Sequence, residues 1–315
     1  MMGAVRWTGV LSLCVLLCGV SWAGNVQVSV TEGGAPVAGA NVRIDPGAIT
    51  GTTNVQGKWV APGVAAGDAT VMAWTETGGV LRGAVANVTV PAAGNAGADL
   101  SLVRAIWLHQ YLPRAVGNRW QYDHRRSETG GATSRGTRRE HVDRPTTVNG
   151  APAVVLVATN DGVFEWEEIQ ACDSNGFTMY TQQHGADTIK FEPPLRCGPL
   201  LPLGYEWTSS GVGKHSDGSP DTRMTFRCKL EGFQDVRVPA GDFPESARVA
   251  VTFVAAGETD QITAWMARGV GIVREIEKNP ARTNTKLLEE YSMRGLAPRP
   301  IAPIRPIGPR RPAMP

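Results

Sequence analysis

Apolar and polar residues alternate along much of the chain, which is the pattern of strands that bury one face. The first such segment places Val26, Val28 and Val30 on one face and ends in Gly33-Gly34. Similar segments follow at Ala40–Ile44, around Trp59, and at 71–74, 85–90 and 100–102. About seven short strands separated by turn signals predict a small β-sandwich over residues 24–103.

The alternation continues over the longer stretch 104–293. Turn sequences of the hairpin type separate its segments, at Asn149-Gly150, Asn160-Asp161-Gly162 and Ser174-Asn175-Gly176. They predict an all-β chain whose second domain is an antiparallel meander, curled into a barrel, a half-barrel or a sandwich. The predicted strands are 118–126, 137–144, 153–159, 163–171, 177–182, 187–191, 222–238, 246–255, 261–267, 271–277 and 284–292.

The first 23 residues have the order of a secretory signal peptide. Arg6 precedes an uncharged apolar run, and Ser21-Trp22-Ala23 has the small residues of a cleavage site. Retention as a membrane anchor and lipidation at Cys14 or Cys18 are the alternatives, although leucine precedes both cysteines. We expect an exported protein, periplasmic or extracellular, without a transmembrane span after cleavage.

The C-terminal stretch 294–315 differs from the rest in composition. Proline recurs at every third position from Pro300 to Pro315, which places the prolines on one edge of a polyproline II helix. The stretch has five arginines and no acidic residue. It predicts either a stiff solvated tail or a basic strip that touches an anionic surface or an aromatic groove.

Charge distribution excludes one class of partner. The formal net charge is +2, but all 29 acidic residues lie between Glu32 and Glu290, so the predicted domains are slightly acidic and the tail is basic. A nucleic-acid-binding face needs a basic folded domain. We therefore expect no nucleic acid partner.

Signal cleavage leaves three cysteines, which allow three single-disulfide pairings. Cys172 and Cys197 lie beside turns at the same predicted end of successive strands, so a bridge between them is our preferred pairing. Cys228 belongs to an alternating segment that predicts an inward strand face. The chain has no Cys-x-x-Cys and no close Cys/His pair, so we predict neither a metal nor a cofactor.

Two polar clusters are candidates for chemistry. Glu165, Glu167 and Glu168 surround Trp166, and paired carboxylates serve glycoside hydrolysis, but on a strand such acids are ordinarily a solvated face. Arginines are frequent between 119 and 144, and pairing of the strands there would gather some of them into a patch for an anionic ligand. The patch residues are Arg125, Arg126, Arg138 and Arg139. No catalytic residue is assigned.

Residues 25–103 resemble the carboxypeptidase regulatory-like domain. The similarity lies in Gly34 to Val42 (Gly-x-Pro-Val-x-Gly-Ala-x-Val), in Thr52 to Trp59 (Thr-Thr-Asn-x-x-Gly-x-Trp) and in the closing segment 99–102. The resemblance implies a transthyretin-like (prealbumin) or immunoglobulin-like sandwich that is non-catalytic. Asn54 stands where that family usually has Asp, and no histidine is followed by Glu at the spacing of the carboxypeptidase zinc motif.

Residues 111–291 resemble a group of uncharacterised bacterial envelope β-domains, some of them lipoproteins. The similarity lies in the segments 112–122, 236–243 and 265–273. The resemblance implies no activity and no catalytic residues.

Together these features predict a non-enzymatic exported protein with a binding or structural role at the bacterial cell envelope. Its expected partners are an envelope polysaccharide or a protein. The alternative is a periplasmic carrier of a lipid or another hydrophobic ligand. A hydrolase acting on polysaccharide is the third possibility.

Overall fold

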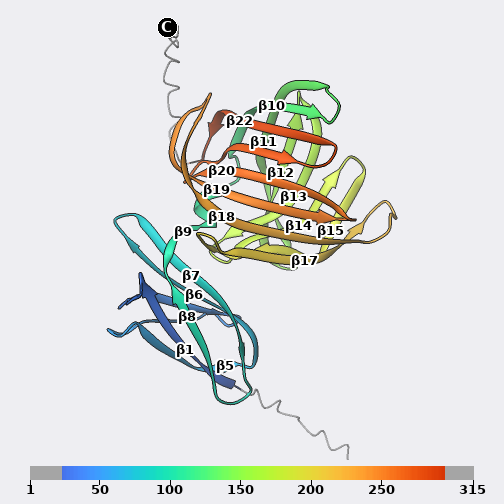
Figure 1. Cartoon of the computed structure of the whole chain (residues 1–315). Coiled ribbons are helices and arrows are strands. Elements are labelled where there is room, and N and C mark those ends of the chain that lie inside the picture. Colours follow the sequence, from blue (N-terminus) through green and yellow to red (C-terminus); the bar gives the residue numbers. More distant parts are fainter. Residues whose placement is uncertain (1–22, 295–315) are drawn as a thin grey trace, which may run out of the picture.

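The computed structural model describes residues 23–294. The predicted signal peptide and tail lie outside the described residues, apart from Ala23 and Arg294 at their edges. Strands make up nearly all of the regular structure, and the one described helix is α1 (Leu108–Tyr111), which confirms the all-β prediction. Within the described residues no helix is long and apolar enough to cross a membrane. Figure 1 shows two strand-built bodies, a smaller N-terminal one and a larger C-terminal one.

Two sheets form the N-terminal body. In the first, β1 pairs with β2, β5 and, in parallel, β8; in the second, the order is β16-β9-β7-β6-β3-β4. The alternating valines of β1 point into a single apolar core to which both sheets contribute. The strands are β1 (Ala23–Glu32), β2 (Ala35–Pro36), β3 (Asn41–Asp45), β4 (Ile49–Thr52), β5 (Lys58–Ala65), β6 (Gly67–Thr77), β7 (Val80–Val90), β8 (Asn95–Ser101), β9 (Val103–Trp107) and β16 (Leu200–Pro202).

The residues of the motif from Gly34 to Trp59 give the backbone the conformation that its turns require. Gly39 and Gly57 both have a φ of +70°, which a residue with a Cβ adopts only with strain. The Asn54 side chain accepts hydrogen bonds from the backbone N–H groups of Gln56 and Lys58, and so holds the turn before β5. Asparagine performs this role without a charge.

The two bodies share a sheet. The predicted boundary between residues 103 and 104 falls within β9, which pairs with β7 on one side and with β16 on the other. Strand β16 comes from the middle of the C-terminal part of the chain, and its residues Leu200 and Leu201 are fully buried. Arg43 also donates to the Asn175 side chain across the junction. The sheet therefore ties the smaller body to the larger one.

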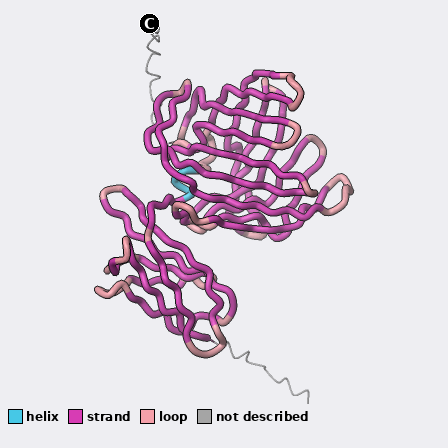
Figure 2. The backbone as a smooth tube through the Cα atoms, viewed as in Figure 1, coloured by secondary structure: helices cyan, strands magenta, loops and turns pink. Residues whose placement is uncertain are grey.

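Twelve strands of the C-terminal body close into a barrel, one of the forms that the sequence predicts. Each ladder is antiparallel, the strands follow chain order with β16 omitted, and β10 pairs with β22 to close the ring (Figure 2). The three predicted hairpin turns lie where they were expected. The strands are β10 (Arg119–Glu128), β11 (Thr133–Val148), β12 (Ala151–Asn160), β13 (Val163–Asp173), β14 (Gly176–His184), β15 (Asp187–Cys197), β17 (Glu206–His215), β18 (Thr222–Val238), β19 (Gly241–Ala255), β20 (Glu258–Ala267), β21 (Gly271–Lys278) and β22 (Arg282–Ser292).

Strand β17 was missed because its sequence lacks apolar alternation. It contains Gly211 and Gly213 where an inward side chain would otherwise stand. A Cβ on Gly213 would lie 2.8 Å from side-chain atoms of both Ile189 and Met224. Gly213 thus leaves room for the large apolar side chains of the neighbouring strands, and Gly211 for the backbone carbonyl of Pro193.

Candidate ligand-binding site in the barrel interior

Charged side chains point into the barrel from the strands around its closing seam. Lys286 Nζ lies 3.0 Å from Glu140 Oε1 and 2.8 Å from Glu275 Oε1, and Arg138 Nε lies 2.9 Å from Glu140 Oε1. We call Arg138, Glu140, Glu168, Glu275 and Lys286 the charged wall. Its residues come from β11, β13, β21 and β22.

Three residues of the charged wall are deeply buried, and Glu168 and Glu275 are half-buried. The exposed fractions of Arg138, Glu140 and Lys286 are 8%, 7% and 6%. Burial alone would raise the pKa of Glu140, but the charges of Lys286 and Arg138 lower it to about 2. For Lys286 burial acts to lower the pKa, and the two carboxylates nevertheless raise it. Glu140 and Lys286 therefore stay ionised at neutral pH, because each has a partner of opposite charge.

Glu168 is the exception in the charged wall. Its carboxylate accepts hydrogen bonds from Gln170 Nε2 at 3.0 Å and Gln182 Nε2 at 3.1 Å, and no ion pair reaches it within residues 23–294. Burial raises the pKa of Glu168 to about 7, against the opposing charge of Arg114. This carboxyl is held in place by neutral amides alone.

His124 lies beside the charged wall with one free ring nitrogen. It is 6% exposed, faces Lys286 across the β10–β22 ladder, and its Nδ1 lies 3.4 Å from Asn160 Oδ1. Its Nε2 is buried and has no hydrogen-bond partner, and the same is true of Asn284 Oδ1. Burial lowers the pKa of His124. Buried polar atoms without partners are rare in folded proteins, so both atoms are open to a further hydrogen bond.

The other side of the interior is apolar. Phe226 lies opposite Phe253 in the β18–β19 ladder, and the rings of Phe226 and Phe177 have centroids 6.2 Å apart. These side chains belong to one continuous cluster. We call Ile189, Met224, Phe226, Val251 and Phe253 the apolar wall.

Parts of the apolar wall keep contact with solvent. Ile189, Val251 and Phe253 face inward but are only half-buried. The charged wall and the apolar region meet at two places around the barrel. Gln182, which holds Glu168, lies opposite Ile189, and at the other seam Glu275 lies opposite Ala264. The interior therefore offers ionic and apolar contacts side by side.

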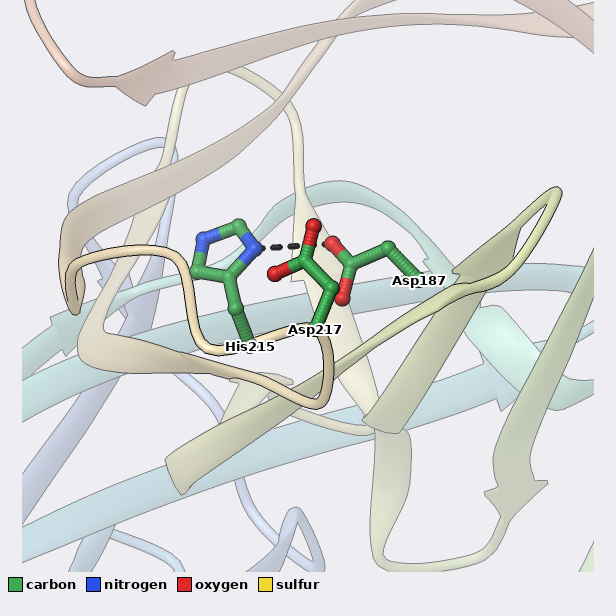
Figure 3. Close-up of side chains that lie close together, drawn as sticks. All are labelled: Asp187, His215 and Asp217. Carbon is green, nitrogen blue, oxygen red and sulfur yellow. Dashed lines mark hydrogen bonds and ion pairs between the residues drawn. The ribbon is translucent and has the colours of Figure 1, made fainter.

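The ends of the barrel differ. At the end near the shared sheet, α1 lies against β13 and β14, and Leu108 packs into the apolar cluster. At the opposite end, Asp187 at the start of β15, His215 at the end of β17 and Asp217 in the turn after it form a polar cluster (Figure 3). The first end is thus covered by apolar packing, and the second carries charged groups.

The cluster at the turn has the spacing of metal ligands, but its groups are already engaged. His215 Nδ1 lies 2.8 Å from Asp187 Oδ2, and its Nε2 lies 3.2 Å from Thr222 Oγ1. The Ser216 backbone N–H donates to Asp187 Oδ1. The hydrogen bond from His215 lowers the pKa of Asp187. These contacts account for the arrangement as a fixed hairpin end.

The four arginines predicted to form a patch do not share a face. Arg138 points inward to the charged wall, whereas Arg139 donates to Gln121 and Arg125 lies 2.9 Å from Asp123 on the outer face. Arg126 pairs with Glu128. The prediction was wrong because successive residues of a strand point to opposite faces.

The carboxylates around Trp166 are also separated. Glu167 points outward to Arg144, at 3.3 Å, while Glu165 accepts a hydrogen bond from Arg138 at 2.8 Å. An irregularity in the β12–β13 ladder beside Glu165 turns this side chain inward, so the alternation expected from the sequence fails there. Sequence reasoning singled out Glu168 but not its interior position, which depends on the register of β13.

The strand register contradicts the predicted disulfide between Cys172 and Cys197. Cys172 lies opposite Phe177, and Phe177 lies opposite Cys197, so a whole strand separates the two cysteines. Two strand spacings amount to about 9–10 Å, which exceeds the Cα separation of up to about 6.8 Å that a disulfide spans. All three described cysteines are free thiols, and Cys228 is buried on the predicted inward face.

A groove of about 770 Å³ lies at the junction of the two bodies. Asp68 and Asn87 line it from the smaller body, and Arg196 and Trp207 line it from the barrel. Trp207 is half-buried, and its Nε1 donates to the carbonyl of Leu200. The groove combines an aromatic ring with amide and carboxylate groups.

No family model and no curated protein matches the chain. Among solved structures, it is similar to a "putative lipoprotein" from Parabacteroides distasonis ATCC 8503, with 14% identity, a TM-score of 0.36, and coverage of 58% of this chain and 98% of that chain. It is also similar to a "putative exported protein with YmcC-like fold" from Bacteroides fragilis NCTC 9343, with 14% identity, a TM-score of 0.34, and coverage of 58% of this chain and 99% of that chain. At these scores neither similarity carries an inference about function.

Proposed function

We propose that this is an exported, non-catalytic binding protein of the bacterial cell envelope, and that its barrel carries an amphiphilic ligand. The observation that supports the proposal is the division of the barrel interior into a charged wall and an apolar wall. A ligand with a polar group and a hydrocarbon part matches both.

Barrel size supports a binding role. Eight-stranded barrels have interiors that side chains fill or that hold one small ligand, and the interior widens with strand number. This barrel has twelve strands. Inward side chains of the apolar wall that stay half-buried are those that a hydrocarbon chain would cover.

The acids of the interior favour binding over catalysis. Glu140, Glu165 and Glu275 are each engaged by Arg138 or Lys286, which fixes their positions. Glu168 is the one acid of this group without an ion pair, whereas a hydrolase of the glycosidase type needs a second available carboxylate at a defined distance across a substrate. The secretory pattern of residues 1–23 supports export.

Binding of an envelope polysaccharide is a second candidate function, favoured by the groove at the junction. Sugar rings stack on aromatic side chains and bind to amides and carboxylates, and Trp207, Asn87 and Asp68 supply these groups there. On this alternative the smaller body contributes directly to the binding site.

Native mass spectrometry of the protein purified from its own envelope, with two variants, tests the proposal. Phe253→Asp places a charge on the apolar wall, and Thr252→Asp places the same charge on the outer face of the same strand. We expect a co-purified amphiphile on the wild type and on Thr252→Asp, but not on Phe253→Asp. Melting curves confirm that both variants are folded.

Wild-type protein that carries no amphiphile and retains none from lipid extracts would overturn the carrier proposal. A bound glycan that is lost in Trp207→Ala would instead support the second candidate. Equal ligand occupancy in Phe253→Asp and Thr252→Asp would show that the amphiphile binds elsewhere.

A further inference from the structure

We propose that Glu168 binds a cationic group, such as a primary amine, on the ligand carried by the barrel. The inference rests on the proposed carrier function and specifies its ligand class. It starts from the one carboxylate of the charged wall that has no cation of its own.

The contrast with the other acids is geometric. Glu140 and Glu275 lie within 3.0 Å of Lys286 Nζ, and Glu165 accepts a hydrogen bond from Arg138. Glu168 receives only the neutral amides of Gln170 and Gln182, one on each oxygen. A carboxylate has about four acceptor sites, so both oxygens can accept further hydrogen bonds.

The charge balance points to the same ligand class. The interior cluster contains four carboxylates, at Glu140, Glu165, Glu168 and Glu275, against the two cations Arg138 and Lys286. Arg114 is the next cation, but its Nε donates to Gln170 Oε1 and not to Glu168. Even with Arg114 counted, the acids exceed the bases by one. One ligand cation would neutralise this excess.

The location suits an amphiphile. Glu168, Gln182 and Ile189 are successive partners across β13, β14 and β15, so the free carboxylate lies two strands from the apolar wall. Trp166, the preceding inward residue on β13, is half-buried, and the Arg138 guanidinium lies over its ring at 5.2 Å. An amine at Glu168 would leave its hydrocarbon chain free to cross to Ile189 and Met224.

Three surfactants with the same decyl chain test the ligand class below their micelle concentrations: decylamine, decyl maltoside and decyl sulfate. Isothermal titration calorimetry at pH 8 with the full chain should show the tightest binding for decylamine. Glu168→Gln should weaken decylamine binding by at least about tenfold, the scale of losing one partner of a buried charge pair. The affinity of Glu168→Gln for decyl maltoside should stay within about twofold of the wild-type affinity, a change much smaller than the loss of one charge pair would cause.

Glu167→Gln is the matched control, because it removes the neighbouring carboxylate, which points outward to Arg144. It should leave all three affinities unchanged. Decylamine binding should also weaken as the pH falls below about 7, since protonation of Glu168 removes its charge. That decline should be absent in Glu168→Gln.

The outcomes separate the two proposals. If decyl maltoside and decylamine bind equally, and Glu168→Gln changes neither, the barrel is a carrier but Glu168 does not select its ligand. If none of the three binds, or if all bind Phe253→Asp as well as wild type, the carrier function itself fails.

Discussion

The two bodies of the chain are built from the same alternating strands but enclose different interiors. The core of the smaller body consists of valine, alanine, leucine and isoleucine, and Thr53 is the one buried polar residue between 23 and 103. The barrel buries Arg138, Glu140 and Lys286 beside its apolar cluster. Strand alternation thus determines which residues point inward, but it does not determine whether those residues are apolar or charged.

This difference bears on the function proposed for the barrel. Burying charges costs free energy even when they pair, and apolar residues of similar size commonly give equal or greater stability. The smaller body shows that this chain can build an apolar interior. Charges kept inside the barrel are therefore not required for stability, which agrees with the proposed role in ligand recognition.

The largest expected effect comes from breaking the ion network of the barrel. Lys286→Met should lower the free energy of unfolding by about 3–5 kcal/mol, because it leaves the buried carboxylates of Glu140 and Glu275 without their shared cation. Chemical denaturation with urea measures the loss. Lys58→Met, at an exposed site of the smaller body, should change the value by less than about 0.5 kcal/mol. A loss below about 1 kcal/mol in Lys286→Met would mean that the network is hydrated and the barrel interior wet.

A pH-dependent effect of about 3 kcal/mol should follow from Glu168, whose pKa is raised by burial from 4.5 to about 7. A carboxyl with a raised folded-state pKa stabilises the fold below its ordinary pKa and loses that contribution as the pH rises through about 7. Without ligand, Glu168→Gln should therefore match wild type near pH 4.5 and be more stable near pH 8. Thermal denaturation across this range measures the difference. If the stabilities of wild type and Glu168→Gln followed parallel pH profiles, the raised pKa of Glu168 would be contradicted.

Glu140 should show the opposite sign in the same experiment. Its pKa is lowered to about 2 by Lys286 and Arg138 against the effect of burial, so its contribution is present above pH 4.5 and lost as the pH falls towards 2. Unliganded protein should therefore be less stable both in acid, through Glu140, and above pH 7, through Glu168. The smaller body has no buried carboxylate that would add to either effect.

Turn chemistry and alternation made much of this fold predictable from the sequence. Asn-Gly and related turns mark the hairpins, and the inward alternation around Cys228 holds in β18. Strand β17 was missed because glycines replace its inward side chains, and β16 because a three-residue strand that joins another sheet has no local signal. The charged wall was missed for a different reason. Strand β11 has charged residues on both faces, so only its pairing shows that Arg138 faces inward and Arg139 outward.

A smaller effect should come from the apolar packing of the N-terminal body. The Trp59 indole lies against Gly51, so that a Cβ at Gly51 would overlap the ring, whereas a Cβ at Gly97 would meet no atom within 4 Å. Gly51→Ala should therefore cost about 1–3 kcal/mol, the scale of overpacking, while Gly97→Ala should be neutral or stabilise by up to about 1 kcal/mol. Urea denaturation followed by tryptophan fluorescence measures both. Equal stabilities for the two variants would show that Trp59 moves aside freely and that the apolar core of the smaller body is not tightly packed at Gly51.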